Sequence, residues 1–146
     1  MAFIDYLDRA FPEKPLFPTD PKLRAKVIQI CEAVNSGIQP LQNLKLLKYF
    51  ETAEGWDQPK REAWVQKWVG EGLSNLEKLL TTTAGKYAFG NDVTAADAFI
   101  VPQLFSTIRF KVNLEPYHIL RNVGDNANQL EAFKKAHPQA QPDFEK

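Results

Sequence analysis

Residues 57–80 read DQPKREAWVQKWVGEGLSNLEKLL. Apolar side chains recur in this stretch every three or four positions, at Trp64, Val65, Trp68, Val69, Leu73, Leu76 and Leu80. This period predicts one long amphipathic helix with Asp57 as its N-cap. Gly72 lies on the apolar side, where glycine costs about 1 kcal/mol of helix propensity relative to alanine. We therefore expect Gly72 to let a neighbouring helix approach closely.

An earlier stretch has the same period. Asp20 is a good N-cap and Pro21 suits the first helical position. The apolar residues that follow at helical spacing are Leu23, Val27, Ile30, Val34, Ile38 and Leu41. Because Pro40 lacks an N–H, it cannot bond to the carbonyl of Ser36 and is expected to kink the helix, which should then continue over residues 41–50.

A third helix should begin after a loop at residues 81–92. Thr94 and Asp97 have the spacing of a capping box, with aspartate in place of the usual glutamate. The residues expected to face the core from this helix are Phe99, Val101, Leu104, Phe105 and Ile108. Shorter helices are expected at 118–122 and 130–136, and no strand alternation is present, so the predicted fold class is all-α.

The first residues form a short amphipathic segment. Phe3, Ile4 and Leu7 lie on one side of a predicted helix at residues 2–10, which is too short to be stable alone. Residues 11–21 contain four prolines and are expected to run extended as a linker. We expect the three apolar side chains to be exposed as a patch liable to association.

Composition narrows the function. The 146 residues are 44% hydrophobic and 25% charged, as in ordinary globular domains, and 18 Lys and Arg balance 18 Asp and Glu. This balance argues against nucleic acid and membrane partners. A single cysteine, Cys31, excludes an intrachain disulfide and suits a reducing compartment, and the N-terminus lacks the apolar run of a secretory signal, so the expected location is cytoplasmic.

No catalytic constellation or metal-ligand spacing is present in the sequence, and Cys31 is expected to be a buried apolar residue. Gln39 and Asn43 are four residues apart, so their amides either share a solvated surface or form one site. Arg109 either complements the dipole of its helix or clamps a carboxylate. The two histidines, His118 and His137, are interpreted as exposed turn residues.

Five segments together resemble zeta-class glutathione transferases, the maleylacetoacetate isomerases. They are GIQPLQNLKLLKYF (37–50), WVGEGLSNLEKLL (68–80), AGKYAFGNDVTAADAFIVPQLF (84–105), RFKVNLEPY (109–117) and LEAFKKAHPQAQPD (130–143). The resemblance runs from Phe3 to Asp143. It implies a helical bundle of the glutathione transferase C-terminal type over residues 22–146, preceded by the linker at 11–21 and by residues 1–10 as a remnant of the last helix of a thioredoxin-like domain.

The resemblance also implies a reaction and a site. The family uses glutathione to isomerise maleylacetoacetate to fumarylacetoacetate in phenylalanine and tyrosine breakdown, and its members are expected to be homodimers. Its glutathione-side positions match Gln39, Asn43, Leu44 and Lys45, and its substrate-carboxylate position matches Arg109. The Thr94–Asp97 capping box occurs throughout the fold and is structural. No position of this chain matches the family's thiol-activating motif, so no catalytic residue is assigned here.

Two functional hypotheses follow. In the first, the chain is the helical substrate-binding domain of a glutathione-dependent maleylacetoacetate isomerase. In the second, it is a truncated, non-catalytic module that dimerises or binds other proteins. In either case the chain alone is expected to be inactive, because none of its groups can lower the pKa of a thiol.

Overall fold

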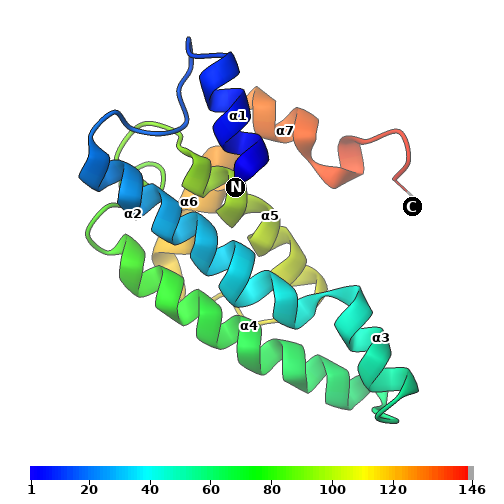
Figure 1. The fold of residues 1–146 in the computed structure, drawn as a ribbon. Coiled ribbons are helices and arrows are strands. Elements are labelled where there is room, and N and C mark those ends of the chain that lie inside the picture. Colours follow the sequence, from blue (N-terminus) through cyan, green and yellow to red (C-terminus); the bar gives the residue numbers. More distant parts are fainter. Residues whose placement is uncertain (145–146) are drawn as a thin grey trace.

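Helices make up the fold of this chain, which a computed structural model describes for residues 1–144 (Figure 1). The α-helices are α1 (Ala2–Ala10), α2 (Pro21–Glu32), α3 (Leu44–Thr52), α4 (Gln58–Leu80), α5 (Ala95–Arg109), α6 (His118–Asn128) and α7 (Glu131–Ala136). Three short helices complete the set: the π-helix η1 (Ala33–Ile38) and the 3-10 helices η2 (Gln39–Gln42) and η3 (Pro138–Ala140). Over this described range β structure is limited to isolated bridges, and the predicted all-α class is confirmed. The last two residues of the predicted domain 22–146 lie outside the described residues.

The core lies where α2, α4, α5 and α6 meet. α5 packs against α2 and α6, and α4 packs against α6, η1 and η2. Fully buried side chains come from α2, η1, α4, α5 and α6, and they include Val27, Val34, Ile38, Leu73, Leu76, Ile100, Leu120 and Val123. In residues 1–144 no helix is both long enough and apolar enough to span a membrane.

Gly72 of α4 faces Ile38 of η1 at very short range. A Cβ atom built on Gly72 would lie 2.4 Å from Ile38 Cγ1 and 2.8 Å from Ile38 Cδ1. The expected close approach at Gly72 is therefore confirmed, and it brings η1 onto α4.

The helix that starts at Pro21 was expected to kink at Pro40 and continue to residue 50, but it ends earlier. α2 ends at Glu32, eight residues before Pro40, and the chain then widens into η1 and tightens into η2. A new helix, α3, begins after Asn43, whose side-chain oxygen accepts from the backbone N–H of Lys45. The missing N–H of Pro40 explains a break near residue 36 but gives no reason for the π turn upstream of it. Leu23, expected in the core, is 44% exposed.

The core-facing side of α5 also differs from the prediction. Ile100, Gln103, Leu104 and Thr107 are buried, whereas Ile108 is 64% exposed and Val101 and Phe105 are only half-buried. Relative to the predicted orientation, the helix is rotated about its axis. The apolar pattern left Gln103 and Thr107 out of the core, but both are buried there because their polar groups are hydrogen-bonded.

The predicted capping box at the start of α5 is confirmed. The Asp97 carboxylate is fully buried and accepts from the backbone N–H of Thr94 at 2.8 Å and from that of Ala88 at 2.8 Å. Burial raises the pKa of the Asp97 carboxyl, and these hydrogen bonds oppose the rise. The box therefore also fixes the loop that precedes α5.

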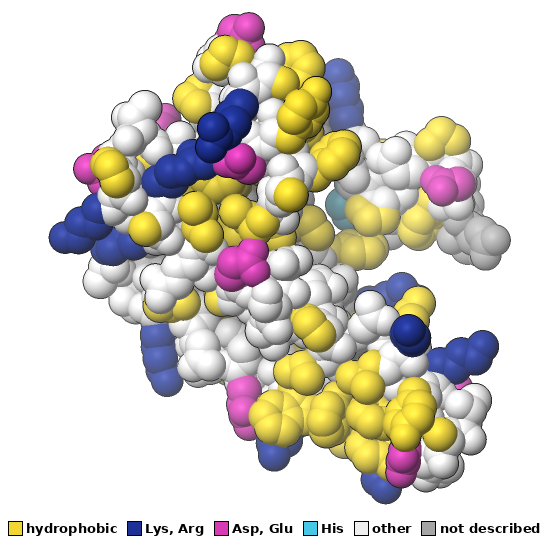
Figure 2. Space-filling model, in the orientation of Figure 1, with side chains coloured by type: hydrophobic (Ala, Val, Ile, Leu, Met, Phe, Trp, Pro, Cys, Tyr) yellow, Lys and Arg dark blue, Asp and Glu magenta, His cyan; other side chains and the backbone are white. Residues whose placement is uncertain are grey.

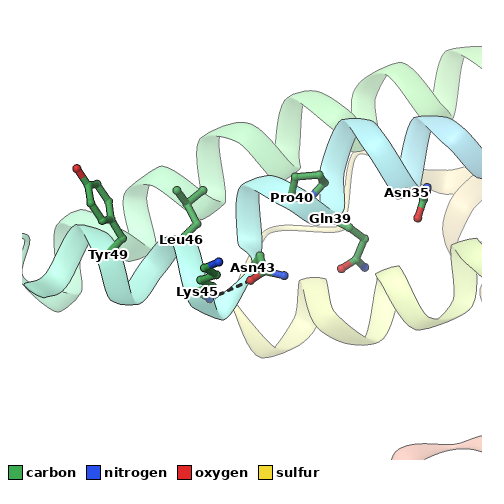
Figure 3. A pocket seen from close by; sticks show the side chains of 7 residues that line it. All are labelled: Asn35, Gln39, Pro40, Asn43, Lys45, Leu46 and Tyr49. Carbon is green, nitrogen blue, oxygen red and sulfur yellow. Dashed lines mark hydrogen bonds between the residues drawn. The ribbon is translucent and has the colours of Figure 1, made fainter. Parts of the chain in front are cut away.

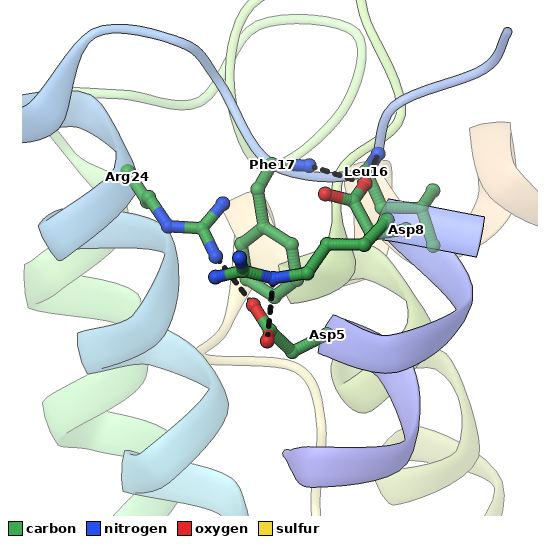
Figure 4. A network of polar contacts seen from close by, with 6 residues as sticks. Asp5, Asp8, Leu16, Phe17 and Arg24 are labelled. Carbon is green, nitrogen blue, oxygen red and sulfur yellow. Dashed lines mark hydrogen bonds and ion pairs between the residues drawn. The ribbon is translucent and has the colours of Figure 1, made fainter. Parts of the chain in front are cut away.

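The proline content predicted an extended linker at residues 11–21, but residues 11–20 contain turns and bends, and Pro21 already belongs to α2. Phe17 is 3% exposed and sits in the core, and the backbone N–H of Ala95 bonds to the carbonyl of Leu16. The Asp8 carboxylate accepts from the backbone N–H groups of Leu16 and Phe17, and Asp5 pairs with Arg24 (Figure 4). These contacts anchor α1 to α2 and to the start of α5.

Candidate functional site

The junction of η1, η2 and α3 forms an open depression of about 600 Å³ (Figure 3). Its lining residues are Asn35, Gln39, Pro40, Asn43, Lys45, Leu46 and Tyr49. Three of the four predicted glutathione-side residues, Gln39, Asn43 and Lys45, are thus brought together. The fourth, Leu44, is 68% exposed and is not among the lining residues.

The oxygen and the nitrogen of the Asn43 side-chain amide have different surroundings. The side-chain oxygen caps α3 by accepting from the Lys45 N–H at 2.9 Å, and the N–H groups of the first turn then lie beside the depression. The amide nitrogen of Asn43 has no hydrogen-bond partner among residues 1–144. Since Lys45 and a helix N-terminus are both positive, this part of the depression favours an anionic group.

The side chain of Gln39 is hydrogen-bonded to the buried Gln103 of α5. Its Nε2 donates to Gln103 Oε1 at 2.8 Å, and the same oxygen accepts from Gln42 Nε2 at 3.0 Å. Gln103 Nε2 in turn donates to Gln42 Oε1 and to Thr107 Oγ1, both at 3.3 Å. No pattern in the sequence predicted Gln42, Gln103 or Thr107 as site residues. Gln103 and Thr107 are four positions apart and so share one side of α5, but Ser106 and Arg109 on the same helix are polar too, and local spacing does not separate the buried pair from them.

Arg109 lies in a second depression, of about 290 Å³, at the end of α5. The other residues that line it are Leu47, Gln58, Arg61, Glu62, Val65 and Phe110. Arg61 is already paired with Glu51 at 2.8 and 3.2 Å, whereas the exposed Arg109 forms no ion pair with any residue from 1 to 144. The predicted site residues therefore divide between two depressions, with Arg109 apart from Gln39, Asn43 and Lys45.

An aromatic cluster flanks the α3 side of the site. Phe50 stacks on Trp56 with ring centroids 4.3 Å apart, and Trp64 meets Phe50 edge-on at 5.1 Å. The indole N–H of Trp64 donates to the carbonyl of Leu41 at 2.9 Å, so the cluster also fixes η2. Figure 2 shows apolar side chains gathered over the end of the molecule that α3 and the first half of α4 form.

The remaining candidate residues have structural surroundings. Cys31 is fully buried, as predicted, and burial raises the pKa of its thiol to about 12. His118 is exposed but begins α6, whereas His137 is half-buried and packs edge-on against Phe105, which corrects its interpretation as an exposed residue. No group of three or more His, Cys, Asp or Glu side chains in the described part of the chain could hold a metal ion.

This all-α bundle, with polar groups gathered at a broken helix, matches one class of known domains. Residues 42–139 match the family described as "Glutathione S-transferase, C-terminal domain". The chain therefore belongs to the glutathione S-transferase C-terminal domain family.

Individual relatives of this chain have narrower descriptions than the family as a whole. The chain is 41% identical to a protein named probable maleylacetoacetate isomerase 2 from Drosophila melanogaster, over 98% of this chain and 60% of that protein. Among solved structures, it matches a holo maleylpyruvate isomerase described as a bacterial zeta-class glutathione S-transferase, with a TM-score of 0.96 and 36% identity over 99% of this chain and 69% of the other.

A second similar structure was solved with bound ligands. It is a maleylacetoacetate isomerase from Anaeromyxobacter dehalogenans with dicarboxyethyl glutathione and citrate in its active site, and it matches with a TM-score of 0.90 and 38% identity over 97% of this chain and 65% of that one. The resemblance to zeta-class enzymes drawn from the sequence is thus confirmed. The chain spans less than two thirds of the length of the Drosophila relative, at 60%.

Proposed function

We propose that this chain is the helical, substrate-side domain of a glutathione-dependent maleylacetoacetate isomerase. The observation that carries the proposal is the gathering of Gln39, Asn43 and Lys45 around one depression, on a fold shared with zeta-class enzymes. Similarity to maleylpyruvate isomerases supports the same reaction type, the isomerisation of a maleyl double bond.

The depression at η2 and α3 has the donors that glutathione requires. Glutathione is an anionic tripeptide, and Lys45 together with the N-terminus of α3 would attract one of its carboxylates. The amides of Gln39 and Asn43 would hydrogen-bond to its peptide groups. Bound there, glutathione would supply the thiol that adds reversibly to the double bond, while residues of this chain hold its backbone.

Arg109 is proposed to bind the substrate carboxylate. A guanidinium group presents paired N–H donors that match a carboxylate, and Arg109 is exposed with no ionic partner in the described structure. Arg61 is less suited to this role because Glu51 already occupies it. Fixing the carboxylate would align the alkene with the nucleophile, which is an effect of orientation.

The test has two arms. Nuclear magnetic resonance titration measures glutathione binding by the purified chain. An isomerisation assay uses the longest protein that its gene encodes. We expect Arg109→Met to raise the KM for maleylacetoacetate about tenfold or more, since a charge-assisted hydrogen-bond pair is lost, and to leave glutathione affinity unchanged.

Arg121→Met is the matched control, because Arg121 is an exposed arginine that contacts His118 and lies away from both depressions at the η2–α3 junction and at Arg109. An Arg109→Met enzyme with an unchanged KM contradicts the assigned role of Arg109. Absence of both glutathione binding and isomerisation would favour the non-catalytic module instead.

We further propose that the intact protein is a cytoplasmic homodimer. The support is the resemblance to the zeta class together with a single, buried and reduced cysteine, Cys31. Light scattering of the gene product gives the oligomeric state, and a monomer at micromolar concentration contradicts the dimer.

A further inference from the structure

Gln103 occupies an unusual position for a glutamine. It lies in the middle of α5 and is 1% exposed, on the core-facing side of the helix that it shares with the apolar residues Ile100 and Leu104. An amide in such a place costs free energy unless all its polar groups are bonded. The bonds that Gln103 makes therefore determine which way its amide must point.

Thr107 sets that direction. The Thr107 hydroxyl donates its hydrogen to the backbone carbonyl of Gln103 at 2.8 Å, so toward the Gln103 side chain it can act only as an acceptor. The Gln103 group that faces Thr107, at 3.3 Å, must then be the nitrogen. Consequently the Gln103 oxygen faces Gln39 and Gln42.

The orientation of Gln39 follows from that of Gln103. An acceptor oxygen at 2.8 Å requires Gln39 to present its Nε2, and it leaves the Gln39 oxygen and the second N–H for the depression. No group in residues 1–144 donates to the Gln39 oxygen. One acceptor and one donor side by side are the complement of a peptide group.

We propose that Gln103 is a positioning residue, which holds the Gln39 amide so that its oxygen and one N–H face a peptide group of the bound ligand. The proposal rests on the proposed function in assuming that this ligand is glutathione. A pre-oriented amide binds more tightly than a mobile one, because its side-chain entropy is already lost before binding.

Two variants of the chain separate positioning from packing. Gln103→Met keeps the length of the side chain but removes the acceptor for Gln39, whereas Gln103→Glu keeps an acceptor oxygen and removes the donors to Gln42 and Thr107. Both are expected to lower stability. Only Gln103→Met should release the Gln39 amide.

The first readout needs no ligand. Relaxation of the Gln39 side-chain ¹⁵N signal is expected to report an ordered amide in the wild type and in Gln103→Glu, and a mobile one in Gln103→Met. Tyr117→Phe is the control for stability loss alone, since it removes the bond from the Tyr117 hydroxyl to the Gly70 carbonyl and leaves Gln39 untouched. An ordered Gln39 amide in Gln103→Met overturns the proposal.

Thr107→Val serves if Gln103→Met does not fold, because it removes only the hydroxyl that fixes the Gln103 amide. We expect Gln39 to become less ordered in this variant as well, and an unchanged Gln39 signal would count against the proposal.

The second readout is glutathione affinity, measured by titration of the same proteins. We expect Gln103→Met to weaken binding about threefold to tenfold and Gln103→Glu to restore it to near the wild-type value. A wild type that does not bind glutathione contradicts the proposed function and leaves the relaxation result to decide the role of Gln103. Equal weakening in both variants, with glutathione bound by the wild type, overturns the positioning role.

Discussion

Replacing Gly72 by alanine is expected to lower the stability of the fold, although alanine favours a helix more than glycine does. Gly72→Ala would gain about 1 kcal/mol of helix propensity but would place a methyl group 2.4 Å from Ile38 Cγ1. We expect a net loss of about 1–3 kcal/mol in the free energy of unfolding, as for other overpacked cores. Urea denaturation measures it.

Gly70→Ala is the matched control on the same helix. The nearest atom to a Cβ at Gly70 is the Tyr117 hydroxyl oxygen, 3.7 Å away, which is ordinary contact. This variant should be unchanged or more stable by up to about 1 kcal/mol. Equal effects at positions 70 and 72 would show that Ile38 does not cause the clash.

Cys31 should make stability depend on pH in the alkaline range. Burial raises the pKa of its thiol from 9.0 to about 12, so above pH 9 the unfolded chain releases a proton that the folded chain keeps. The contribution of Cys31 is thus complete below pH 9 and is lost as the pH rises toward 12.

Comparison with Cys31→Ala isolates this effect. Between pH 8 and pH 10 the wild type should lose about 1.4 kcal/mol relative to Cys31→Ala, as measured by urea denaturation at each pH. Parallel pH profiles for the two proteins would mean that the thiol ionises in the folded state.

At the scale of elements, α3 depends on its cap. Asn43→Ala removes the acceptor for the Lys45 N–H and is expected to cost about 1 kcal/mol of stability. Asn43→Asp keeps that acceptor but replaces the free amide nitrogen with a negative charge beside the depression.

The free energy of unfolding and the glutathione affinity should therefore rank the two variants in opposite orders. Denaturation is expected to find Asn43→Asp close to the wild type, while glutathione titration finds it weaker than Asn43→Ala, because the new charge repels an anionic ligand. Unimpaired glutathione binding by Asn43→Asp would exclude an anion at this end of α3.

At the scale of the whole molecule, α1 presents an apolar face while its other side is anchored. Phe3, Tyr6 and Phe11 are 76%, 65% and 63% exposed, and Leu7 is 38% exposed. Ile4 was expected to be exposed with them but is half-buried against the core. The patch in Figure 2 over α1 is therefore held in place by Asp5, Asp8 and Ile4.

Replacing Phe3, Tyr6 and Phe11 together by serine should lower the binding of a hydrophobic fluorescent dye, with little change in the unfolding free energy, because these side chains make few folded-state contacts. Ile4→Ser is the control and should destabilise the protein. Dye fluorescence that does not fall in the triple variant would refute an exposed α1 face.

The sequence by itself determined the class of fold, the close approach at Gly72, the capping box at Thr94 and Asp97 and the burial of Cys31. These features follow from local spacing, since a helical period and a cap involve residues at most four positions apart. The resemblance to zeta-class enzymes also needed only the order of the residues along the chain.

Tertiary structure alone decided how α5 is rotated, where the helix after Pro21 ends and which depression each site residue lines. The bond between Gln39 and Gln103 joins residues 64 positions apart, and the apolar pattern gave no sign that a glutamine on α5 is buried. Such a residue becomes favourable in the core only when partners from another segment satisfy its amide. That condition depends on packing and not on local sequence.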